Sequence, residues 1–161
     1  MRTNLFAILV SALMFLGHTG NTSANNPQPG NSDASGGSEK SNEVITLDKD
    51  AFIDQVFDYE NNENWNYKGS KPAIIDFYAD WCGPCKKLSP LLEELQGEYD
   101  GDIQVYKVDT EKSRDLASAF GIQSLPTIVF VPLDEEPQAV MGFVPKEKLT
   151  EMIASILKVE Q

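Results

Sequence analysis

The pentapeptide Trp81-Cys82-Gly83-Pro84-Cys85 holds the only two cysteines of the chain and is its most informative feature. Two thiols three positions apart close too small a loop for a disulfide to stabilise the folded state much. A zinc site needs three or four ligands, and the sequence has no second cysteine pair. The spacing is typical of reversible dithiol chemistry, so we interpret Cys82 and Cys85 as a redox pair and predict neither a metal site nor a bound cofactor.

The first 24 residues have the three parts of a secretory signal peptide. Met1-Arg2 is positively charged, residues 5–17 are almost wholly apolar, and Thr22-Ser23-Ala24 offers small residues for cleavage. The apolar run is shorter than the roughly 20 residues of a membrane-spanning helix, so an uncleaved membrane anchor is the weaker interpretation. We therefore expect residues 1–24 to be a signal peptide and the protein to be exported, to the periplasm of a bacterium.

The charge and the histidine content exclude several classes of function. Removing residues 1–24 takes away one of 13 basic residues and none of 25 acidic ones, which changes the formal net charge from −12 to −13. Such an acidic surface disfavours binding to nucleic acid or to anionic lipid. The single histidine, His18, lies in the expected signal peptide. The remaining chain therefore has no imidazole for Ser–His, Cys–His or His-ligated metal chemistry.

Composition divides the rest of the chain into a linker and one domain. Residues 25–43 are rich in Asn, Ser, Gly and Pro and contain hardly any apolar side chain. Such a segment cannot bury enough surface to offset the entropy of ordering it, so we predict a flexible linker. Residues 44–161 are enough for one ordinary domain with a proper core.

Apolar periodicity after residue 44 alternates between strands and helices. Strands are expected at residues 44–47, 73–79, 103–108, 127–131 and 138–142, and helices at residues 48–57, 85–99, 113–120 and 145–157. Pro90 should kink the second helix, and residues 59–70 should form a surface loop whose Trp65 and Tyr67 pack down locally. The order βαβαβαββα predicts an α/β domain with a mixed central sheet flanked by helices on both faces.

From residue 44 to the C-terminus the sequence resembles the thioredoxin family. The resemblance lies in Trp-Cys-Gly-Pro-Cys-Lys between a strand and a helix, in Asp76 six positions before Cys82, and in Ser124-Leu125-Pro126-Thr127 at the start of the next core strand. It implies a thioredoxin fold over residues 44–161. Tyr78, Ser124 and the longer loop at residues 59–70 depart from the common family pattern.

The two cysteines are expected to have different roles. A helix N-terminus stabilises a thiolate, so Cys82 should be the nucleophile. Cys85, one turn inside the helix, should be buried and should resolve the mixed disulfide. Gly83 and Pro84 are expected to tune the redox potential of the two cysteines. This Gly-Pro dipeptide resembles the one in reducing thioredoxins, because strongly oxidising relatives carry a His between the cysteines.

Asp76 is the one charged residue in an apolar strand. Burying an unpartnered carboxylate raises its pKa and costs several kcal/mol, which suggests a use for it. The resemblance implies that Asp76 takes a proton from Cys85, directly or through water, and that Lys107 is the family's lysine near this acid.

The resemblance also implies a substrate-binding surface around the cysteines. Pro126 matches the family's cis-proline, and its neighbour Leu125 would present backbone groups to an extended substrate. Other residues implied in the apolar rim are Trp81, Gly121, Ile122, Gly142 and Phe143. We assign Val140 and Met141 to the core rather than to binding.

These observations favour an exported thiol–disulfide oxidoreductase that reduces disulfides of cell-envelope proteins. Its expected partners are those proteins and a membrane electron donor or a thioredoxin reductase-like protein, and we expect a monomer. Net disulfide donation or isomerisation in oxidative folding is one alternative, because export leads to an oxidising compartment. A non-catalytic interaction module that uses the same surface is the other.

Overall fold

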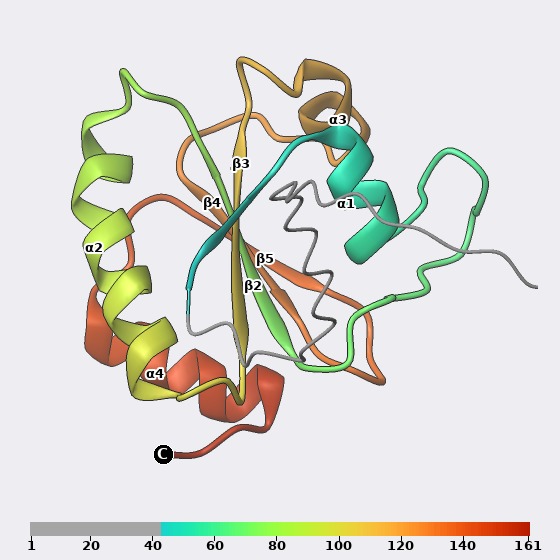
Figure 1. The fold of residues 1–161 in the computed structure, drawn as a ribbon. Helices are drawn as coiled ribbons and strands as arrows, with labels where there is room; N and C mark the ends of the chain where they lie inside the picture. Colours follow the sequence, from blue (N-terminus) through green and yellow to red (C-terminus); the bar gives the residue numbers. More distant parts are fainter. Residues whose placement is uncertain (1–42) are drawn as a thin grey trace, which may run out of the picture. The chain divides into compact units, whose positions relative to one another are not determined.

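Five strands form one mixed sheet in the order β1-β3-β2-β4-β5 (Figure 1). The structure is a computed structural model, and it describes residues 43–161. The strands are β1 (Ile45–Leu47), β2 (Ala73–Tyr78), β3 (Gln104–Asp109), β4 (Thr127–Val131) and β5 (Gln138–Met141). The expected signal peptide at residues 1–24, and all but the last residue of the expected linker at 25–43, lie outside the described part.

The sheet combines parallel and antiparallel pairs, as the order of elements predicted. β3 runs parallel to both β1 and β2, whereas β4 pairs antiparallel with β2 and with β5. β2 is therefore central, and its first five residues are all buried. This burial explains the continuous apolar run of its sequence, since both faces of the strand are covered.

Helices cover both faces of the sheet. They are α1 (Lys49–Gln55), α2 (Gly83–Glu98), α3 (Arg114–Ala119), α4 (Lys146–Met152) and the π-helical η1 (Ile153–Leu157). One core joins leucines of α2, α4 and η1 to Ile74, Ile128 and Phe130. The other joins Phe52 and Leu116 of α1 and α3 to the opposite side of the same strands. Figure 1 shows α2 and α4 on one side and α1 and α3 on the other. The α2 face of β2 carries both Ile74 and Asp76, because alternate residues of a strand share a face.

Helix α2 is unbroken although it contains Pro90. The sequence predicted a kink at this residue, and the helix runs without a break from Gly83 to Glu98. Its buried side chains include Cys85, Leu88, Leu92 and Leu95, which follow the predicted apolar stripe. None of the helices in residues 43–161 combines the length and apolarity that crossing a membrane requires.

The extra loop between α1 and β2 packs against the domain as predicted. The Trp65 ring lies 4.8 Å from that of Phe57 and 6.5 Å from that of Phe120, centroid to centroid. The Tyr67 hydroxyl donates a hydrogen bond to the carbonyl oxygen of Lys71 at 2.9 Å. These contacts attach the loop to the α1–α3 side of the sheet.

Replacing Asp48 by alanine should lower the free energy of unfolding by about 0.5–2 kcal/mol. Asp48 is the N-cap of α1, and its carboxylate accepts a hydrogen bond from the backbone N–H of Ala51 at 2.9 Å. Urea denaturation measures the change. Asp48→Asn is the control and should retain most of the stability, because asparagine caps helices equally well. A loss for Asn as large as that for Ala would contradict a capping role.

Candidate active site

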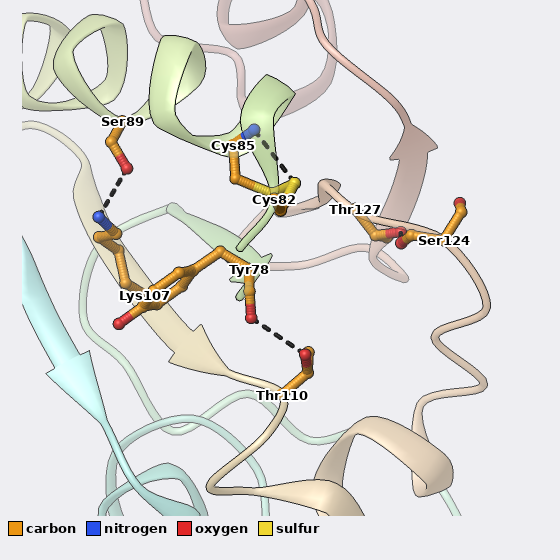
Figure 2. Close-up of a disulfide and its surroundings, with 8 residues drawn as sticks. All are labelled: Tyr78, Cys82, Cys85, Ser89, Lys107, Thr110, Ser124 and Thr127. Atoms are coloured by element: carbon orange, nitrogen blue, oxygen red, sulfur yellow. Dashed lines mark hydrogen bonds between the residues drawn. A yellow bond between two sulfur atoms is a disulfide. The ribbon is translucent and has the colours of Figure 1, made fainter. Parts of the chain in front are cut away.

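The loop between β2 and α2 places both cysteines at the start of a 16-residue helix. Cys82 is the N-cap of α2, and its Sγ accepts a hydrogen bond from the backbone N–H of Cys85 at 3.2 Å. The two residues are joined by a disulfide, as Figure 2 shows. When this bond is reduced, the Cys82 sulfur lies where unpaired backbone N–H groups and the helix dipole stabilise negative charge.

The surroundings of the two cysteines differ more than their exposure does. Cys82 is 3% exposed and Cys85 is 2% exposed. Cys85 faces a cavity of about 270 Å³. The other residues lining this cavity are Tyr78, Ala79, Asp80, Lys86, Ser89 and Lys107. Cys82 is followed directly by Gly83 and Pro84, which are both exposed. The geometry therefore fits attack on a substrate by Cys82 and proton transfer at Cys85.

Asp76 is buried on the α2 face of the sheet, with 0% exposure. Neither carboxylate oxygen has a hydrogen-bond partner among the described residues. Burial raises the pKa of Asp76 from its ordinary 3.8 to about 6, and the positive charge of Lys107 lowers it in part. A carboxyl group with this pKa can accept or release a proton near neutral pH.

Lys107 lies beside Asp76 across the β2–β3 pair, as the resemblance implied. Its ammonium group donates a hydrogen bond to the Ser89 hydroxyl at 2.7 Å and lies 4.7 Å from the centroid of the Tyr78 ring. No ion pair within residues 43–161 joins it to Asp76. Ser89 was not among the residues predicted for the site. Its position four residues after Cys85 was a usable signal, because such residues share one face of a helix.

The peptide bond between Leu125 and Pro126 is cis, as predicted. Leu125 packs against the cluster of Ala79, Cys82 and Cys85. The backbone N–H of Gly142 donates to the Pro126 carbonyl oxygen at 2.7 Å. Thus the start of β4 and the end of β5 lie together next to the disulfide.

Two hollows flank this region, and three of the predicted rim residues, Gly121, Ile122 and Phe143, line them. The first, of about 380 Å³, is lined by Gly83, Pro84, Lys87 and Phe143. The second, of about 230 Å³, includes Gly121, Ile122 and Met141. Trp81 is 69% exposed, so its ring is accessible from solvent.

The assignment of Met141 to the core was wrong, because this side chain is 71% exposed. Met141 and Val140 point to opposite faces of β5. Val140 packs against the core on the α2 side. β5 is an edge strand, and nothing among residues 43–161 covers its other face at Met141.

Comparison with known proteins identifies one family. The sequence pattern of the thioredoxin family matches residues 44–155. A thioredoxin of Borreliella burgdorferi is 50% identical over 110 residues, which are 68% of this chain and 94% of the relative. A chloroplastic M-type thioredoxin of Spinacia oleracea is 38% identical over 100 residues, which are 60% of this chain and 55% of that protein. Among solved structures, chloroplastic thioredoxin z superposes with a TM-score of 0.61 at 29% identity, covering 73% of this chain and 96% of the other.

Proposed function

The chain belongs to the thioredoxin family, and from this premise we propose that it is an exported reductase of disulfides in cell-envelope proteins. It is a protein-disulfide reductase with an active-site cysteine pair, Cys82 and Cys85. The observations that carry the proposed mechanism are the position of this pair at the N-terminus of α2 and the buried, unpartnered carboxyl group of Asp76 on the face of β2 that α2 covers.

In the first step the Cys82 thiolate attacks one sulfur of a substrate disulfide. The substrate S–S bond breaks, a mixed disulfide forms, and one substrate thiolate leaves. In the second step the Cys85 thiol loses its proton and attacks Cys82 Sγ, which releases the second substrate thiolate. Two electrons pass to the substrate, whose thiolates take up two protons, and the enzyme is left with the Cys82–Cys85 disulfide.

Asp76 is proposed to accept the proton of Cys85 in the second step, directly or through a water molecule. A pKa near 6 makes its carboxylate available at neutral pH while leaving it a stronger base than an exposed aspartate. The cis Pro126 and its neighbour Leu125 are proposed to bind the substrate backbone, with Trp81, Ile122 and Phe143 among its apolar contacts.

The proposed export is supported by the charge, apolar run and small residues of the first 24 positions. An exported reductase needs a source of electrons outside the cytoplasm, so a membrane protein or a thioredoxin reductase-like partner is proposed to reduce the disulfide again. We expect the mature protein, isolated from a cell-envelope fraction, to begin at Asn25. Recovery in the cytosol with Met1 intact would contradict export while leaving the chemistry untouched.

The reduction potential of the Cys82–Cys85 couple tests the direction of the reaction. We expect a value near the roughly −270 mV of thioredoxin, because the Gly-Pro pair matches the reducing members. Equilibration of the protein in dithiothreitol buffers, followed by thiol quantification, measures it. A value near the roughly −120 mV of strong oxidants would contradict the reductase and favour disulfide donation.

A further inference from the structure

The ammonium group of Lys107 forms its hydrogen bond with a neutral hydroxyl although a buried carboxylate lies on the neighbouring strand. It is 2.7 Å from Ser89 Oγ on α2, while Asp76 occupies the adjacent position of β2. The Asp76 oxygens have no partner in the described part of the chain. Figure 2 shows the Lys107 side chain reaching toward Ser89 alongside the Tyr78 ring.

We propose that Ser89 is a positioning residue that holds the Lys107 ammonium off the Asp76 carboxylate and so keeps that carboxylate free to take up a proton from Cys85. The inference rests on the proposed role of Asp76 in the reaction. It adds Ser89, which lines the same cavity as Cys85, lies four positions after it, and acts through Lys107.

The physical argument concerns the strength of the alternative contact. An ammonium and a carboxylate attract far more strongly in a buried site than in water. A direct ion pair would hold Asp76 as a carboxylate and weaken it as a base. The Ser89 hydroxyl offers another acceptor, and the Tyr78 ring adds a cation–π contact at 4.7 Å. Both contacts keep the positive charge of Lys107 near Asp76 without a direct ion pair between the two groups.

The charged and titratable groups around this cavity come from three segments. They are Tyr78 at the end of β2 with Asp80 in the turn after it, Cys85 and Lys86 on α2, and Lys107 on β3. From β4, Ile128 stands opposite Asp76 and does not titrate. Asp80 is exposed, so solvent screens its attraction for the ammonium. In the oxidised protein Cys85 does not titrate, which leaves the Asp76–Lys107 interaction open to direct measurement.

The test is the pKa of Asp76 in the oxidised protein, followed by the ¹³C carboxyl resonance in an NMR titration. In Ser89→Ala the ammonium loses its hydroxyl acceptor and moves toward Asp76, so we expect the pKa of Asp76 to fall by about one unit. Ser89→Thr keeps the hydroxyl and should leave the pKa close to that of the unsubstituted protein. An Asp76 pKa that is unchanged or raised in Ser89→Ala would overturn the proposal.

A double substitution shows whether the effect passes through Lys107. In a Lys107→Gln protein the ammonium is absent, so adding Ser89→Ala should no longer shift the Asp76 pKa. A shift of equal size in both backgrounds would mean that Ser89 acts by another route, and the proposal would fail.

The pH profile of insulin reduction separates this proposal from the role of Asp76 itself. If Asp76 is the proton acceptor, Ser89→Ala should displace the acidic limb of the profile to lower pH by the same amount as the NMR pKa. If the Asp76 pKa measured by NMR falls but the pH profile of insulin reduction does not move, Ser89 does position Lys107, and the use of Asp76 as a base is refuted.

Discussion

Replacing Cys82 by serine should abolish disulfide reduction, lowering kcat/KM for insulin by at least about a thousand-fold. The reason is that the hydroxyl of serine is not ionised at neutral pH, so the helix N-terminus has no thiolate to stabilise. Insulin turbidity, with dithiothreitol as the electron source and a correction for its direct reaction, measures the loss.

Cys85→Ser is the matched control for this prediction. It lacks the same disulfide, so any loss of stability from the missing crosslink is shared by both variants. Because Cys82 remains, the first step proceeds and the mixed disulfide cannot be resolved. We expect a covalent adduct between this variant and its substrate, detected by mass spectrometry and absent for Cys82→Ser. Adducts formed by Cys82→Ser alone would reverse the roles of the two cysteines.

Replacing Asp76 by asparagine should make the protein more stable than the unsubstituted protein, and this advantage should grow as the pH rises from 3 to 8. The pKa of Asp76 is about 6 in the folded protein against an ordinary 3.8. Between these values the folded state binds the proton and the unfolded state does not, so the stability of the unsubstituted protein falls as the pH rises through this window. The full difference is about 3 kcal/mol, and it is absent below pH 3.8.

Urea denaturation of the oxidised proteins at pH 3, 5 and 8 measures this effect. The difference in free energy of unfolding between Asp76→Asn and the unsubstituted protein should grow by about 3 kcal/mol across the series. Asp80→Asn is the control, because its side chain is exposed in the same region and should show no such growth. A constant difference for Asp76→Asn would show that burial does not hold the proton on this carboxyl.

The same variant should turn over more slowly at neutral pH, because Cys85 loses its proposed proton acceptor. A gain in stability together with a loss of activity is the signature expected of a residue retained for chemistry. Unchanged kinetics of insulin reduction between pH 6 and 8 would remove Asp76 from the mechanism, whatever its effect on stability.

Much of the fold could be predicted because local patterns encode it. Residues 127–131 are the bounds of β4 in both the prediction and the structure. Asp48 caps its helix as expected. The last helix differs, because an apolar stripe at helical spacing predicted one α-helix where α4 passes into the π-helical η1. Apolar periodicity shows which side of a helix is buried. It does not fix which backbone carbonyl accepts the hydrogen bond from each N–H in the last turns, which is what distinguishes an α-helix from a π-helix.

The amino-acid pattern alone was enough to predict the redox pair, its place between a strand and a helix, and the burial of Asp76 in an apolar strand. These follow from local spacing, which short-range sterics and backbone hydrogen bonding translate directly into structure. Two features could be seen only in the folded domain: the hydrogen bond from Lys107 to Ser89, 18 positions away, and the exposure of Met141. The hydrogen bond depends on how α2 packs over β3, and the exposure of Met141 depends on which strand lies at the edge of the sheet. Packing is a property of all the elements together, so no single segment encodes it.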